Sequence, residues 1–134
     1  MPRYFVDTWF LVARFDRADD QHAAAMAIDR RVGRSVMVSH DGVMTEFLAY
    51  VAAYDSHNRR GAVEFVRDFM RRYLVVESGR PLFLRALDLY ARRLDKEYSL
   101  VDCMSMVSMR DLGLTHVLTN DHHFRQEGFT VVNE

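Results

Sequence analysis

Four acidic residues stand either close after a short apolar segment or within a segment of helical periodicity. They are Asp7, Glu46, Asp102 and Asp121. Asp7 directly follows a predicted strand and Asp121 stands three residues after another, and the carboxyl ends of parallel strands form the edge at which α/β sheets bind ligands. Carboxylates gathered there would repel one another unless a divalent cation neutralised them. An all-oxygen site suits Mg²⁺, with Mn²⁺ as a possible substitute, and such cations promote phosphodiester hydrolysis.

Each acid also has a purely structural explanation. Asp7 could be the N-cap of a short helix. Asp102 lies three residues after Ser99, which is the spacing of a capping box, and Asp121 could stand in the first turn of a helix. Glu46 lies inside a helical segment between apolar residues, where an acid either faces solvent or is held inward by a cation or metal. The joint pattern therefore carries more weight than any single acid.

Short β-favouring runs alternate along the chain with segments of helical periodicity. The predicted strands are residues 4–6, 36–38, 74–76, 116–118 and 130–132. The predicted helices cover roughly residues 18–33, 41–56, 59–72, 80–95 and 100–112, with Gly113 ending the last of them. Helices long enough to cross over between strands imply a parallel sheet covered on both faces. The expected fold class is α/β, a three-layer α/β/α sandwich around a central parallel sheet.

Length and composition exclude several classes of protein. A chain of 134 residues, 49% of them hydrophobic, has the size of one compact domain, which we expect to span residues 1–134. The only cysteine, Cys103, has no partner for a disulfide, and we expect it to be a buried structural thiol. Without a signal peptide or an apolar run long enough to span a bilayer, we expect a cytoplasmic protein with no membrane role.

Positive charge gives a weaker signal than the acids. The formal net charge is −1, so RNA binding would have to come from local basic clusters. One such cluster lies on the third long helical segment, where an RNA-backbone contact is one interpretation and a solvated covering face is the favoured one. Its members are Arg59, Arg60, Arg67, Arg71 and Arg72.

Four short motifs follow one another along the chain, each at the end of a strand or within a helix. They are Phe5-Val6-Asp7-Thr8, Thr45-Glu46-Phe47, Ser99-Leu100-Val101-Asp102-Cys103 and Thr119-Asn120-Asp121-His122-His123-Phe124. In this order and spacing they resemble the PIN domain, and most closely the VapC-type toxins of bacterial and archaeal toxin–antitoxin pairs. The resemblance covers essentially the whole chain.

The resemblance implies a magnesium-dependent endoribonuclease, the toxin of a pair, with a small antitoxin as partner and a homodimeric state. It implies that all four acids hold the metal and that Thr8 and Thr119 support them through hydroxyl hydrogen bonds. Products would carry a 5′-phosphate and a 3′-hydroxyl, because activated water replaces the ribose 2′-hydroxyl as nucleophile.

Two positions depart from the family pattern. Cys103 stands where a small residue is frequent, and His123 stands where some relatives carry a further acid. Fewer carboxylates would weaken a second metal site, so the number of metals stays open. We expect both His122 and His123 to be solvated on an exposed helical turn, outside the site.

Two other functions stay open. One is a non-catalytic domain that keeps the fold for binding RNA or protein. The other is a phosphoryl-transfer α/β protein that uses Asp7 as nucleophile. A phosphatase of this kind is disfavoured because Trp9 stands where it needs a second acid. A receiver domain is disfavoured because it needs a lysine after a late strand, whereas the only lysine, Lys96, precedes the fourth predicted strand.

Overall fold

The computed structural model describes residues 2–33 and 35–134, and its strands form one parallel sheet. The strands are β1 (Arg3–Val6), β2 (Val36–His40), β3 (Leu74–Val76), β4 (His116–Leu118) and β5 (Thr130–Val132). Their order in the sheet is β3-β2-β1-β4-β5, and every pairing is parallel. The parallel sheet expected from the sequence is confirmed, and β3, β4 and β5 have the expected bounds.

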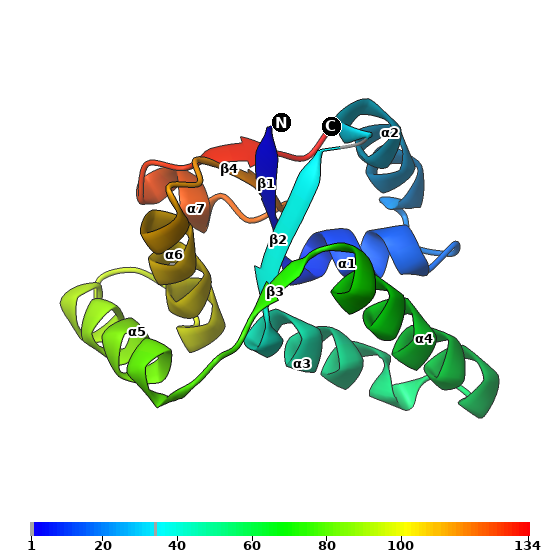
Figure 1. The fold of residues 1–134 in the computed structure, drawn as a ribbon, viewed down its shortest axis with the longest axis horizontal. Helices are drawn as coiled ribbons and strands as arrows, with labels where there is room; N and C mark the ends of the chain where they lie inside the picture. The colour runs from blue at the N-terminus through cyan, green and yellow to red at the C-terminus, as the bar shows by residue number, and fades with distance from the viewer. Residues whose placement is uncertain (1, 34) are drawn as a thin grey trace.

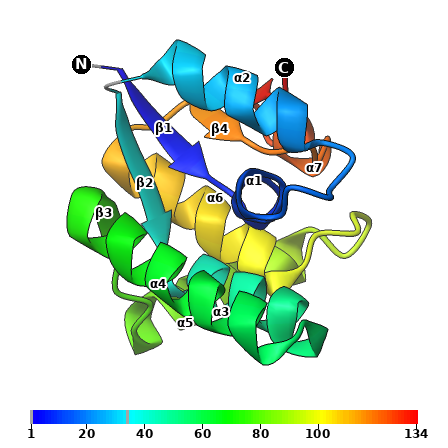
Figure 2. The same cartoon turned by 90° about the vertical axis from the view of Figure 1, so that its right-hand side faces the viewer.

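Helices connect the strands and cover the sheet on both sides (Figure 1, Figure 2). They are α1 (Thr8–Phe15), α2 (His22–Val32), α3 (Asp41–Tyr50), α4 (Ser56–Arg72), α5 (Arg80–Arg92), α6 (Leu100–Leu112) and α7 (His123–Gln126), with a 3-10 turn η1 (Val51–Ala53) after α3. In Figure 1, α5 and α6 lie to the left of the sheet, and α1, α2 and α4 lie to the right. This is the three-layer α/β/α arrangement predicted. In the described ranges, none of these helices has both the length and the apolar character needed to cross a membrane.

β1 lies at the centre of the sheet, between β2 and β4. Phe5 pairs with Val38 of β2, Val6 pairs with Leu118 of β4, and Phe5 and Val6 are fully buried. A strand with neighbours on both edges and helices on both faces has no solvated side, which explains its continuous apolar run. The Asp7 N–H donates to the Leu118 carbonyl at 3.2 Å, so Asp7 leaves the sheet at the middle of its carboxyl edge.

The helix α1 was missing from the predicted helical segments. Its buried residues are consecutive: Phe10, Leu11, Val12 and Ala13. Adjacent apolar residues give no one-sided stripe, which is the signal that periodicity detects. The helix is buried on several sides because it packs against both α2 and α3.

Side-chain hydrogen bonds explain where other helices depart from their expected starts. α2 begins later than predicted because the carboxylates of Asp16 and Asp19 accept backbone N–H groups two residues further on, which holds that segment in turns. α4 begins earlier than predicted because Asp55 caps it, accepting from the N–H of Asn58 at 2.9 Å. Short polar side chains therefore set these two boundaries.

Two expectations for α6 are confirmed. The helix has the predicted bounds and ends at Gly113, whose φ of 67° is the left-handed conformation that favours glycine. Cys103 is fully buried within it, and burial raises the pKa of its thiol to about 11. A thiol protonated in this way is a packing residue, since the thiolate is the reactive form.

Candidate metal centre

Asp7 lies where β1 ends and α1 begins. It occupies the N-cap position of α1, but its side chain makes no capping hydrogen bond to the described residues of that helix. Its Oδ2 instead accepts from Thr119 Oγ1 at 2.7 Å, and only 6% of the residue is exposed. Burial raises the pKa of Asp7 to about 7, and the charges of Asp102 and Glu46 act in the same direction. The capping explanation is therefore wrong for this acid.

Glu46 is half-buried in α3 and meets the start of α1, where Thr8 Oγ1 donates to its Oε1. The beginning of α3 is anchored by a buried residue that the sequence analysis did not consider, His40. Its Nδ1 accepts from the Gly42 N–H at 3.0 Å, and its Nε2 lies 2.9 Å from Ser105 Oγ on α6. This anchoring fixes the helix that directs Glu46 toward α1 instead of toward solvent.

Asp102 takes part in the capping box predicted at the start of α6. Its N–H donates to Ser99 Oγ at 3.0 Å, and its Oδ2 accepts from the Ser99 N–H at 3.0 Å. The side chain is only 13% exposed. Burial raises the pKa of Asp102, and the charges of Asp121 and Glu46 raise it further. Capping and proximity to the other acids therefore coexist in this residue.

Asp121 follows β4 and is tied to Asp7 by one hydroxyl. Thr119 Oγ1 donates to Asp7 Oδ2 and accepts from the Asp121 N–H at 3.1 Å. Because Thr119 is fully buried, this hydroxyl holds the two strand ends in a fixed relation. Asp121 Oδ1 in turn accepts from the His123 N–H at 2.9 Å, which closes a turn before α7.

The turn at Asp121 also brings His123 into the site. Its Nδ1 lies 3.0 Å from Asp121 Oδ1 and 3.6 Å from Asp102 Oδ2, and its side chain is 16% exposed. The prediction that both histidines are solvated holds for His122, which is exposed, and is wrong for His123. The Asp-x-His spacing was the available signal, because a turn closed by an aspartate places residues i and i+2 close together.

The structure brings the four predicted acids to one place. Charge interactions connect Asp7 with Glu46 and Asp102, and Asp102 with Asp121 and Glu46. Among residues 2–33 and 35–134, neither an arginine nor a lysine forms an ion pair with any of the four. Ligand atoms of Asp102, Asp121 and His123 lie within 4.8 Å of one another. Close carboxylates with no paired arginine or lysine among the described residues fit a divalent metal ion.

Several solved structures share this fold over nearly the whole chain. VapC20 of Mycobacterium tuberculosis, described as a sarcin-ricin loop cleaving toxin, superposes with a TM-score of 0.86 at 24% identity, over 98% of this chain and 99% of that one. FitAcB from Neisseria gonorrhoeae superposes with a TM-score of 0.71 at 14% identity, over 97% and 96%. VapBC2 from Rickettsia felis, bound to promoter DNA, gives 0.69 at 11%, over 98% of both chains.

Sequence comparison gives the family directly. The curated proteins yield no match. The family model described as PIN domain matches residues 4–129, which includes all four acids and nearly the whole fold. The resemblance expected from the sequence motifs is confirmed, and the chain belongs to the PIN domain family.

Proposed function

We propose that this protein is a divalent-metal-dependent endoribonuclease and the toxin of a toxin–antitoxin pair. The observation that carries the proposal is the meeting of Asp7, Glu46, Asp102 and Asp121 at the carboxyl edge of the sheet, with Asp7 buried and its pKa raised to about 7. A fold that keeps a buried acid beside other acids pays in stability, and a bound cation reverses that cost. Family membership and the fold shared with VapC20 support the same assignment.

Each acid has a proposed task. Asp7, Asp102 and Asp121 hold Mg²⁺, or Mn²⁺ as a substitute, and Glu46 holds metal or orients the attacking water. When bound, the cation supplies positive charge that polarises the phosphoryl group and favours deprotonation of water. Thr119 fixes the Asp7 carboxylate, and Thr8 fixes that of Glu46. Attack by water gives a 5′-phosphate and a 3′-hydroxyl.

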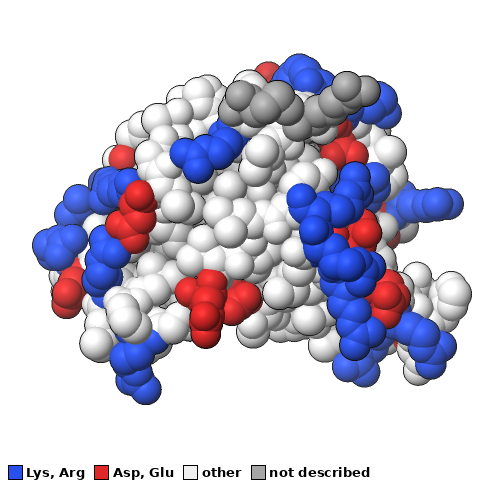
Figure 3. All heavy atoms as spheres, viewed as in Figure 1, with Lys and Arg blue, Asp and Glu red and all other residues white. Residues whose placement is uncertain are grey.

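RNA contacts are proposed for α4, where arginines gather on the right of Figure 3. Arg67 and Arg72 pair with Glu64 and Asp68 of the same helix, as expected for a solvated covering face. The Arg67–Glu64 pair also lines a groove of about 610 Å³ that α4 shares with α3 and η1. The arginines that line this groove are Arg59, Arg60 and Arg67. Guanidinium groups there are suited to holding phosphate oxygens.

Two protein partners are proposed. The first is a small antitoxin, because the solved relatives include FitAcB and VapBC complexes. The second is another copy of this chain. Apolar side chains that a dimer interface would cover lie exposed on α5 and just beyond it: Phe83, Leu84, Leu87, Tyr90 and Leu94.

Cleavage of total RNA by the purified protein tests the proposal. Reactions contain Mg²⁺, Mn²⁺ or excess chelator, and each is repeated with Asp7→Asn and with Asp88→Asn, an exposed acid of α5 that serves as matched control. We expect metal-dependent cleavage that Asp7→Asn abolishes and Asp88→Asn retains, with 5′-phosphate products. Cleavage that survives chelation or the Asp7 substitution would reject the site. Absence of cleavage with every RNA offered would favour a non-catalytic binding domain.

A further inference from the structure

We propose that His123 is a nitrogen ligand of the metal held by Asp102 and Asp121, and that it shifts the preference of this position from Mg²⁺ toward Mn²⁺. The inference rests on the proposed function, because it concerns the same metal site. It adds a residue that the four-acid pattern does not contain, and it assigns a metal selectivity that carboxylates alone would not give.

The position of the His123 imidazole is the first observation. Its Nδ1 lies 3.0 Å from Asp121 Oδ1, yet it is completely buried and has no hydrogen-bond partner among the described residues. Asp121 Oδ1 already accepts the backbone N–H of His123 at 2.9 Å. Two ligand atoms thus lie close together without being aligned to bond to each other. Donor atoms that converge in this way, with Asp102 Oδ2 3.6 Å from the same nitrogen, are arranged for a shared cation.

The packing around the imidazole is the second observation. The His123 ring packs against the rings of Tyr98 and His122, with centroid distances of 5.5 and 4.9 Å. The Tyr98 hydroxyl donates to Glu127 Oε1 at 3.1 Å. Glu127 is itself held by an arginine, since Arg93 Nε donates to its Oε1 at 2.5 Å. Tyr98, fixed in this way, restricts the orientation of the His123 ring, as metal-binding histidines require.

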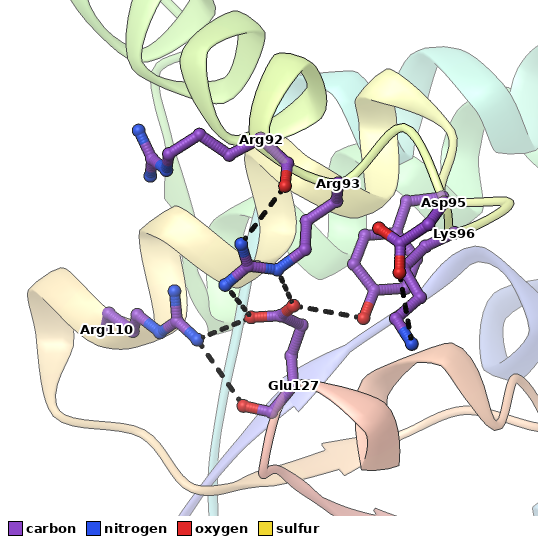
Figure 4. A network of polar contacts seen from close by, with 7 residues as sticks. Arg92, Arg93, Asp95, Lys96, Arg110 and Glu127 are labelled. Carbon is purple, nitrogen blue, oxygen red and sulfur yellow. Dashed lines mark hydrogen bonds and ion pairs between the residues drawn. The ribbon is translucent and has the colours of Figure 1, made fainter.

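Figure 4 shows how the carboxylate of Glu127 is held between Arg93, which directly follows α5, and Arg110 of α6. The network lies one side chain away from His123, with Tyr98 in between. It touches none of the four acids through the hydrogen bonds and ion pairs of the described residues. Its contribution to the metal position therefore passes through the orientation of the His123 ring.

Ligand chemistry gives the expected selectivity. Mg²⁺ prefers oxygen ligands and retains its waters, whereas imidazole nitrogen binds transition-metal dications more strongly than it binds Mg²⁺. Mn²⁺ accepts both oxygen and nitrogen ligands, so replacing one oxygen donor with Nδ1 raises affinity for Mn²⁺ relative to Mg²⁺. A relative that carried an acid at this position would lack this preference.

Metal binding by the chelator-treated protein provides the test. Mn²⁺ affinity is measured from the electron paramagnetic resonance signal of the free ion, and Mg²⁺ affinity by competition. Nitrogen coordination is detected as ¹⁴N modulation of the electron spin echo of bound Mn²⁺. The variants are His123→Ala, His123→Asp and, as matched control, His122→Ala, which removes the exposed neighbouring imidazole.

For His123→Ala we expect about tenfold weaker Mn²⁺ binding, less than about threefold change for Mg²⁺, and loss of the ¹⁴N modulation. His122→Ala should resemble the wild type in all three. His123→Asp should bind both ions without ¹⁴N modulation, and it keeps the test valid if the alanine variant fails to fold. Wild-type Mn²⁺ binding without ¹⁴N modulation, or modulation that survives loss of His123, would overturn the inference. If the protein cleaves RNA but shows no ¹⁴N modulation from His123, the proposed function stands and the inference about His123 fails. If ¹⁴N modulation depends on His123 but no RNA is cleaved, the inference stands and the proposed function fails.

Discussion

Two groups of buried carboxylates in this protein have opposite surroundings. Glu127, whose side chain is 4% exposed, is met by Arg93, Arg110 and the Tyr98 hydroxyl. Burial alone would raise the pKa of Glu127, but these hydrogen bonds outweigh it and lower the pKa. At the sheet edge, by contrast, the pKa of Asp7 is raised to about 7 by burial and by other acids.

The contrast separates a carboxylate whose negative charge is compensated by arginines from a group of carboxylates whose charge no arginine or lysine of the described residues compensates. Arginines from α6 and from the residue that follows α5 complete the environment of Glu127, so that no further ion is needed there. The acid cluster has hydroxyl and backbone N–H donors but, within the described ranges, no arginine or lysine paired with it. We infer that the first group serves stability and the second serves the binding of a cation.

The largest expected difference between the two groups is in catalysis. Glu46→Gln should lower the rate of RNA cleavage by about 1,000-fold while keeping the fold, because it removes a charge from the site. Glu127→Gln should lower the rate by less than about tenfold, since that carboxylate lies outside the cluster. Single-turnover cleavage with circular dichroism as a fold control measures both. Equal losses in the two variants would mean that the division between the groups is wrong.

Glu127, which matters little for catalysis, should matter for the stability of the fold. Glu127→Ala leaves two arginines and a tyrosine hydroxyl without their shared partner, and we expect it to lower the free energy of unfolding by about 2 to 3 kcal/mol, less than for a fully buried pair because both arginines are partly exposed. Chemical denaturation followed by tryptophan fluorescence, with Asp88→Asn as control, gives the value. A loss below about 0.5 kcal/mol would show that the network contributes little.

Divalent metal should stabilise the protein through the acid cluster and its neighbour His123, and not through the Glu127 network. At a concentration 100 times the dissociation constant, Mn²⁺ should raise the free energy of unfolding by about 2.7 kcal/mol. Glu127→Gln should keep this increase, and Asp121→Asn should lose most of it. Thermal melts with and without chelator make the comparison. An equal increase in the Asp121 variant would place the cation elsewhere.

The smallest expected effect is a stabilisation of the metal-free protein by Asp7→Asn. The folded-state pKa of Asp7 is raised from 3.8 to about 7, so its contribution to stability is complete below pH 3.8 and is lost as the pH rises toward 7. Above pH 7 the variant should be more stable than the wild type by about 1 to 2 kcal/mol, and the difference should shrink as the pH falls to 4. Denaturation of both proteins in chelator from pH 4 to 8 tests this. A variant less stable than the wild type at pH 8 would contradict the assigned shift.

Much of the arrangement was predictable because it depends on strand ends. Asp7 and Asp121 follow adjacent parallel strands, so the sheet itself brings them together. The capping box of Asp102 was predictable from its spacing to Ser99. The capping-box spacing is a local signal. The meeting of the strand ends follows from the sheet topology, which the apolar segments and the helix lengths predict.

The remainder depends on contacts that no local pattern encodes. Glu127 meets arginines 34 and 17 residues earlier in the chain, and nothing near it signals this. The helix α1 lacks a one-sided stripe because it is buried on several sides. His123 enters the site through a turn closed by the side chain of Asp121. Each is a tertiary or side-chain effect that overrides periodicity.

The most direct test of the central claim is the location of the metal in crystals of the protein soaked with Mn²⁺. Anomalous difference density collected at the manganese edge should show a peak between Asp7, Asp102 and Asp121, and that peak should be absent from crystals of Asp7→Asn soaked in the same way. A cluster without anomalous density at saturating Mn²⁺, in crystals where the ion occupies other acids, would contradict the claim that these carboxylates form a metal site.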